Sequence, residues 1–175
     1  MSDHVGGPPA MGAAFLLAQL GAHASARYAD KVAGLDLDPA QTGVLHLIAR
    51  QPGQSQQSLA AQLGVAASKV VSLIDGLESR HVLERRRSTT DRRNYALYLT
   101  EQGQHLIRQL REVAIEHEAD LSAGLDADEH RLLTNLLRKV ADQQGLTPGV
   151  HPGYRRLATP PVPRAGIADR AEEQR

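Results

Sequence analysis

The stretch LAAQLGVAASKVVSLIDGLESRHVLERRRSTTDRRNYALYLTEQG, Leu59 to Gly103, decides the fold because its hydrophobic period changes part-way along. Its first half carries apolar residues at helical spacing on either side of Gly64, a residue type that commonly ends a helix. These are Leu59, Ala60 and Leu63 before the glycine, and Val70, Leu73, Ile74 and Leu77 after it. We predict a short helix capped by Ser55 and a second helix at about 67–80, which together form a helix-turn-helix.

The second half of the stretch has the alternation of β-strands. Val82–Arg85 and Tyr95–Leu99 alternate in side-chain character, and Ser88 to Asp91 between them are residues typical of a turn. Five arginines surround this turn. A helix-turn-helix followed directly by such a hairpin is a winged helix, here with a basic tip.

Helices are also predicted on both sides of this stretch. Apolar residues recur at helical spacing between Met11 and about Ala33, and Asp38-Pro39-Ala40-Gln41 has the pattern of a capped helix start. Thr100 caps a long helix to about Ser122, and Asp126 with Glu129 opens a final helix that ends at Gly145. Residues 1–10 are predicted to be flexible, and the Pro-rich residues 145–175 to form a disordered tail.

The composition is that of a helical domain with an aliphatic core. Of the 175 residues, 41% are hydrophobic but only 3% are aromatic. Cysteine is absent, which excludes disulfides, thiolate metal sites and thiol-based peroxide sensing. No apolar run approaches the ~20 residues that span a bilayer, and the N-terminus has no signal-peptide pattern. We therefore expect a cytoplasmic protein without membrane contact.

Charge is distributed unevenly although the net charge is zero. Residues 41–100 contain 8 basic and 4 acidic side chains, whereas the rest of the chain contains 12 basic and 16 acidic side chains. A basic middle between acidic ends is expected when one lobe binds a polyanion and the remainder does not.

The sequence contains no pattern typical of catalysis. There is no Gly-rich phosphate loop, no nucleophile elbow and no carboxylate pair in a non-helical cleft. The chain has 8 His, but His105 and His117 on the long helix are too far apart to share an ion. We expect no enzymatic activity, no cofactor and no metal site.

The run from Leu59 to Gly103 resembles the MarR family of winged-helix transcription regulators. The pieces that carry the resemblance are Asp91-Arg92-Arg93 at the wing tip, the strand that follows it, and the helix start Leu99-Thr100-Glu101-Gln102-Gly103. The resemblance implies a mainly α fold with a small β-wing, over roughly residues 11–144. It divides that region into a DNA-binding lobe at about 39–100 and dimerisation helices at about 11–33 and 101–144.

The implied function is sequence-specific binding of double-stranded DNA by a homodimer, more often a repressor, on a pseudo-palindromic operator. The helices at 11–33 and 101–144 are also too apolar for one small lobe to cover, which independently favours a partner chain. The alternative is a winged-helix module whose wing contacts another protein. The arginine-rich tip favours phosphate over a mixed protein surface.

The DNA-binding residues follow from the two elements that reach DNA in this fold. The N-terminal part of a recognition helix contacts base edges, and arginines suit the negative potential of a narrow minor groove. Asp91 would position an arginine, as the resemblance implies, and the strand arginines would alternate between phosphate and solvent. The candidates are Ser68, Lys69 and Ser72 on the helix, and Arg85, Arg86, Arg87, Asp91, Arg92 and Arg93 on the wing.

Two positions depart from the family pattern. Ala66 replaces a common polar N-cap, so Ser68 is expected to cap the recognition helix and start it later. His81 stands where relatives usually have a glycine, at a position predicted to be left-handed.

Many family members bind a small aromatic or phenolic effector between the dimer helices and the winged lobe. The residues on the segments that would line this cleft are His23, Arg27, Tyr28 and His46. For each of them a structural role is the alternative, above all for His46 within an apolar helix. Because the chain has no Trp, a pocket built on a first-helix Trp is excluded.

Overall fold

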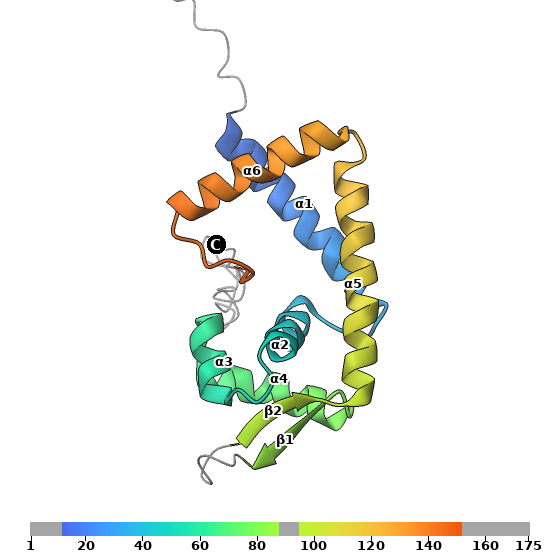
Figure 1. Cartoon of the computed structure of the whole chain (residues 1–175), viewed down its shortest axis with the longest axis vertical. Helices are drawn as coiled ribbons and strands as arrows, with labels where there is room; N and C mark the ends of the chain where they lie inside the picture. The colour runs from blue at the N-terminus through green and yellow to red at the C-terminus, as the bar shows by residue number, and fades with distance from the viewer. Residues whose placement is uncertain (1–11, 88–94, 152–175) are drawn as a thin grey trace, which may run out of the picture.

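The computed structural model describes residues 12–87 and 95–151, and within them the chain forms helices and one small sheet (Figure 1). The elements in chain order are α1 (Ala13–Ala33), α2 (Pro39–Arg50), α3 (Gln56–Leu63), α4 (Ala67–Ser79), β1 (Leu83–Arg87), β2 (Tyr95–Leu99), α5 (Glu101–Ser122) and α6 (Ala127–Gln143). The predicted class, mainly α with a small β-wing, is confirmed.

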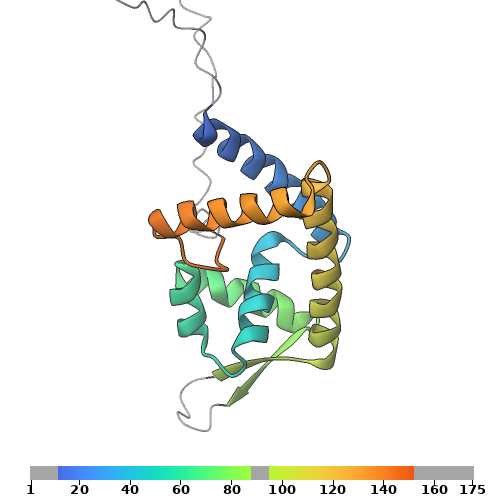
Figure 2. The ribbon, with the colours of Figure 1, turned by 45° about the horizontal axis from the view of Figure 1, so that its top comes forward.

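The elements are arranged in two regions joined by α5. Helices α2, α3 and α4 and the hairpin gather at one end, where β1 and β2 project from the lobe (Figure 1). Helix α5 starts beside the hairpin and runs to the other end, where α1 and α6 lie. The second view agrees with this arrangement (Figure 2).

Side-chain caps determine where most of the helices start. Asp38 accepts a hydrogen bond from the Gln41 amide at 2.7 Å, and the Gln41 side chain accepts from the Asp38 amide at 3.0 Å, which completes a capping box. Asp126 and Glu129 form a second box at α6. Ser55 and Thr100 cap α3 and α5 as predicted.

Helix α4 starts without a side-chain cap. Ala66 is the extended N-cap residue and makes no side-chain hydrogen bond, and the helix begins directly at Ala67. The expectation that Ser68 caps a later start is therefore wrong. Since Val70 in the first turn is fully buried, core packing holds this end of the helix in place of a cap.

The hairpin has the predicted antiparallel pairing. Leu83 pairs with Leu99 and Arg87 with Tyr95, and Ser55 adds an isolated bridge to Ala96. The turn that joins the strands lies outside the described residues. His81, just before β1, has a φ of 56°, so the predicted left-handed conformation is confirmed.

One aliphatic core joins the lobe to the middle of α5. Its fully buried large side chains include Leu45 and Ile48 of α2, Ile74 and Leu77 of α4, and Leu110 of α5. Gly103 lets α5 approach the hairpin, because a Cβ at this position would lie 2.0 Å from the Val82 carbonyl oxygen. The start of α5 is therefore fixed against the base of β1.

The helices at the other end leave their apolar faces uncovered. No residue of α6 is buried, and none of the larger packing contacts of the described chain involves this helix. Exposed large hydrophobic residues on α1 and α6 are Phe15, Leu16, Leu17, Leu20, Leu132, Leu133, Leu136, Leu137 and Val140. This is the excess of apolar surface that the sequence predicted.

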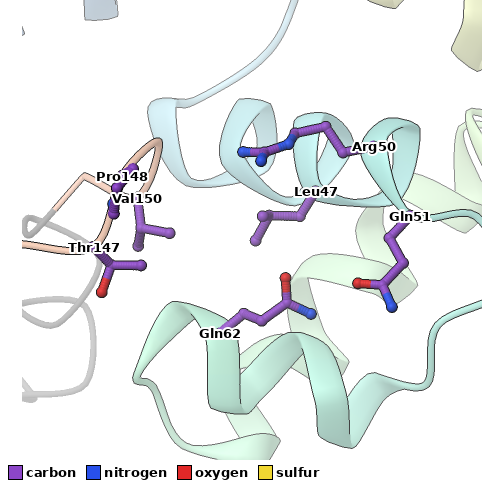
Figure 3. Close-up of a pocket in the computed structure, with 7 residues that line it drawn as sticks. All are labelled: Leu47, Arg50, Gln51, Gln62, Thr147, Pro148 and Val150. Carbon is purple, nitrogen blue, oxygen red and sulfur yellow. The ribbon is translucent and has the colours of Figure 1, made fainter.

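The first residues after α6 return toward the lobe. The sequence analysis includes residues 145–151 in the tail, and in the structure Thr147, Pro148 and Val150 face α2 and α3 (Figure 3). Within this segment the Val150 amide donates to the Thr147 carbonyl at 3.2 Å. The remaining tail, residues 152–175, and the N-terminal residues 1–11 lie outside the described residues.

Candidate nucleic-acid interface

The outer face of α4 carries the polar side chains expected for base contact. Ser68, Lys69 and Ser72 are all exposed, while the opposite face, with Val70 and Ile74, is fully buried. This burial fixes the rotation of the helix and so determines which side chains point outward. The structure therefore places the three candidates together on one accessible surface.

Val71 belongs to the same surface, and the sequence analysis missed it. Its side chain is 38% exposed, in a helix whose other apolar residues face the core. Helical periodicity in the sequence could have indicated Val71, because residues at positions 68, 71, 72 and 75 share one face of a helix. An exposed valine there can contact a thymine methyl group.

Arg85 lies on the inner face of the hairpin, against α4. Its guanidinium forms ion pairs with Asp75 and Glu78, and its side chain is only 17% exposed. The Gln56 side-chain oxygen lies 2.6 Å from Arg85 Nε in the amide orientation that satisfies both groups. Partial burial alone would lower the pKa of Arg85, but the hydrogen bond from Arg85 to Asp75 and the charge of Glu78 raise it above its ordinary value.

Arg86 and Arg87 are the two exposed arginines of the same strand. Arg86 donates to Glu84 Oε1 at 2.9 Å from Nε, and its guanidinium carbon lies 4.6 Å from the centre of the Tyr98 ring. Arg87 is exposed and pairs across the strands with Tyr95, which is 48% exposed. Asp91, Arg92 and Arg93, the other wing candidates, lie outside the described residues.

A second group of candidates lies between α1 and α5. Tyr28 packs on His117 with ring centres 5.5 Å apart, and Arg27 pairs with Asp120 at 3.3 Å. Lys31 reaches both Glu116 and Asp120 at 3.0 Å, and these hydrogen bonds raise the pKa of Lys31 and lower that of Asp120. The structure thus brings Arg27 and Tyr28 of the predicted set together in one polar cluster.

His117 is the residue that the effector prediction missed in this cluster. Its Nδ1 is buried without a hydrogen-bond partner in the described structure, and burial followed by the charges of Lys31 and Arg27 lowers its pKa. The sequence did contain a signal, because position 117 continues the apolar stripe of α5 that passes through Leu106, Leu110 and Val113.

The two remaining effector candidates are not part of this cluster. His46 is half-buried on α2, and burial together with the charge of Arg111 lowers its pKa. This environment agrees with the structural role given as the alternative. His23 is exposed on α1, and the structure shows no hydrogen bond or ion pair for it among the described residues.

Within residues 12–87 and 95–151, no three His, Asp or Glu side chains are close enough together to hold a metal ion. No single helix of this part of the chain is long and apolar enough to cross a membrane; α3 and α4 meet those criteria only as a pair bent by 116°.

Comparison with known proteins agrees with this geometry. The family model for the MarR family matches residues 37–95, which contain α2, α3, α4 and β1. A transcriptional repressor, CouR, solved bound to a 23-mer DNA duplex, is 30% identical with a TM-score of 0.66. That similarity covers 77% of this chain and 99% of CouR.

The chain belongs to the MarR family. A mutant of MarR from E. coli, solved in complex with operator DNA, is 25% identical with a TM-score of 0.62, over 71% of this chain and 90% of that chain. A Thauera aromatica protein assigned as the transcriptional regulatory protein for the hcr operon is 34% identical over 110 residues. These residues are 63% of this chain and 66% of the relative's length. The chain is thus a MarR-family transcriptional regulator with the winged-helix fold.

Proposed function

We propose that this MarR-family regulator acts as a homodimer that binds a pseudo-palindromic DNA duplex and represses transcription until a small aromatic or phenolic ligand releases it. The observation that carries the proposal is the exposed face of α4, with Ser68, Lys69 and Ser72, in the same lobe as the exposed Arg87. Such a regulator would act in the cytoplasm, where the DNA is. Half-sites would lie ~10 bp apart, because each recognition helix must meet the same face of the duplex.

Base reading would come from the first half of α4. Lys69 can donate to guanine or phosphate, and the hydroxyls of Ser68 and Ser72 can contact bases or phosphate. Val71 would add an apolar contact to a thymine methyl group. This mixture of donors and one small apolar side chain suits the major groove.

The wing would supply the electrostatic part of the affinity. Arg87, Arg92 and Arg93 are the arginines that we assign to the minor groove or its phosphates, with Asp91 orienting one of them. Arg86 would contact phosphate from its position on Tyr98. We leave Arg85 out of this set, because its guanidinium already binds Asp75 and Glu78.

The uncovered faces of α1 and α6 support the homodimer. Five large apolar side chains of α6 are at least 40% exposed, namely Leu132, Leu133, Leu136, Leu137 and Val140. A contiguous apolar surface of this kind is costly in water and is typical of an obligate interface.

The effector would bind where α1 meets α5. Tyr28 and His117 offer aromatic faces, and Arg27 offers a cation for an acidic or phenolic oxygen. His23 on α1 and His46 on α2 lie outside this cluster and complete the candidate set. A ligand there would change the distance between the two winged lobes of the dimer.

Fluorescence anisotropy over a salt series tests the DNA-binding proposal. Wild-type protein should prefer its own upstream intergenic DNA over a scrambled duplex. Lys69→Ala should weaken binding about tenfold, and Arg87→Ala should reduce the slope of log affinity against log salt by about 1. Lys139→Ala, an exposed lysine on α6, is the matched control and should change neither quantity.

One binding result would contradict the DNA-binding proposal. If the wild type bound neither this DNA nor a pool of genomic fragments better than the ~10⁻⁴–10⁻⁶ M typical of non-specific binding, the DNA proposal would be wrong. The wing would then have to be a protein-binding surface.

A further inference from the structure

A cavity separates the lobe from the segment that follows α6 (Figure 3). It has a volume of about 390 Å³ and is lined by Leu47, Arg50, Gln51, Gln62, Thr147, Pro148 and Val150. This volume lies within the range of roughly 300–1,000 Å³ that is usual for small-molecule sites. The cavity is distinct from the cluster between α1 and α5, with which it shares no residue.

Arg50 supplies a positive charge at this cavity. Its side chain extends from the end of α2 toward the segment at 147–150 (Figure 3). Gly149 lies beside the guanidinium, since a Cβ there would lie 2.9 Å from Arg50 Nη1, and its φ of 73° suits glycine. No carboxylate within residues 12–87 and 95–151 forms an ion pair with Arg50.

Gln62 supplies a fixed hydrogen-bond acceptor on the α3 side. Its Nε2 donates to Gln54 Oε1 at 2.6 Å and to Ser58 Oγ at 3.1 Å, so both amide hydrogens are engaged. The Gln62 side-chain oxygen is consequently directed toward Leu47 (Figure 3). Gln54 is itself 6% exposed and donates to the Leu47 carbonyl at 2.9 Å, which anchors the network.

The remaining walls are mixed: Gln51 adds an amide and Thr147 a hydroxyl beside three apolar side chains. Leu47, which is 7% exposed, lines the α2 side of the cavity. Pro148 and Val150 face it from the segment after α6 (Figure 3). The cavity therefore presents one guanidinium, an aliphatic surface formed by Leu47, Pro148 and Val150, and the polar groups of Gln51, Gln62 and Thr147. A site with one such cation beside apolar walls binds a ligand that has one anionic end and an apolar remainder.

We propose that this cavity is a binding site for a small organic monocarboxylate. Arg50 holds the carboxylate through charge-assisted hydrogen bonds, Leu47 and Val150 contact the apolar body, and the Gln62 oxygen accepts from a hydroxyl where the ligand carries one. The site is additional to the proposed effector cleft, and it holds whether or not the protein binds DNA.

Binding is measured on the full chain by methyl and side-chain amide NMR, with hexanoate as the probe. Hexanoate should shift the methyl signals of Leu47 and Val150 and the side-chain amide signal of Gln62. Acetate lacks the apolar body and hexanamide lacks the charge, so both should bind at least about tenfold more weakly. Arg50→Gln should weaken hexanoate binding by about the same factor.

Matched variants separate the site from general charge effects. Arg108→Gln removes an exposed arginine from α5 and should leave hexanoate affinity unchanged. Val150→Ser keeps Arg50 but removes part of the apolar wall, so it should weaken hexanoate and leave acetate unaffected. The backbone spectrum of each variant checks that it is folded.

Three results would overturn the proposal. Hexanoate and hexanamide could bind equally, which would remove the role of charge. Arg50→Gln could bind hexanoate as well as the wild type does. Hexanoate could shift only signals around Tyr28 and His117, which would assign binding to the other cleft.

Discussion

Arg85 shows how a single residue can attach the wing to the rest of the lobe. Its guanidinium links β1 to Asp75 and Glu78 of α4, so it fixes the hairpin against the recognition helix. Arg85→Gln should reduce the free energy of unfolding by about 1–2 kcal/mol, because two carboxylates then lose their partner at a partly buried position. Urea denaturation measures this loss.

The neighbouring Arg87 is the matched comparison. Arg87→Gln should leave the urea midpoint unchanged, since its side chain is exposed, but should lower the salt dependence of DNA binding. Loss of stability in Arg87→Gln but not in Arg85→Gln would contradict the assignment of the two roles.

Histidine burial predicts how stability changes with pH. The pKa values of His46 and His117 are lowered from 6.5 by burial, so below about pH 6.5 the unfolded chain binds more protons than the folded chain. Folding stability should therefore fall as the pH decreases from about 7.5 to 5.5. Asp120, whose pKa is lowered from 3.8, affects stability only at more acidic pH.

Thermal unfolding of His46→Asn and His117→Asn at several pH values checks the predicted decrease of folding stability at lower pH. Each substitution removes one titrating group, so the decrease in melting temperature between these pH values should become smaller. His105→Asn, exposed on α5, is the control and should retain the full wild-type dependence.

At the scale of elements, the sequence predicted the helices well because local chemistry determines where they start. Asp38 with Gln41, and Asp126 with Glu129, form their capping boxes within four residues of chain. The partners of Arg85 could not be predicted in this way. The alternating pattern of a strand gives two faces but does not tell which one packs against α4.

The junction between the hairpin and α5 gives a test at this scale. Gly103→Ala would put a Cβ 2.0 Å from the Val82 carbonyl oxygen, so α5 or β1 must move. We expect a loss of more than about 2 kcal/mol, although alanine favours a helix by about 1 kcal/mol over glycine. Chemical denaturation measures the change.

Gly76→Ala inside α4 is the internal control for helix propensity. The nearest atom to its Cβ would be Gln41 Nε2 at 3.9 Å, an ordinary contact with a flexible side chain. This variant should be neutral or slightly stabilising. Equal losses in the two variants would show that the close approach at Val82 is unimportant.

At the scale of the whole molecule, the exposed faces of α1 and α6 predict how the chain assembles. Leu136→Glu places a charge in the middle of the α6 surface, where Leu136 is 52% exposed, and should convert the proposed dimer into monomers. Light scattering after size exclusion measures the mass. Asn135→Glu changes the polar face of the same helix and should leave the mass unchanged.

The sequence predicted these uncovered faces but not the position of residues 145–151. Apolar periodicity shows that α6 has a face to bury, and the low polar content of that face indicates a protein partner. Glycines and prolines in a tail show only that regular structure ends. Thr147 and Val150 face α2 and α3 across the cavity, and no local pattern encodes this arrangement of residues that are distant in sequence.

The length of α5 and its attachment to the wing determine how far the wing moves when the helix tilts. The Thr100 hydroxyl donates to the His81 carbonyl at 2.5 Å, so the first turn of the helix moves with the base of the wing. Its 22 residues form a rod about 33 Å long, at 1.5 Å per residue. A tilt of about 5° around the far end of such a lever displaces the wing by about 3 Å, which is close to the length of one hydrogen bond. A small rearrangement near α1 would therefore be amplified into a displacement large enough to break the groove contacts proposed for the wing arginines.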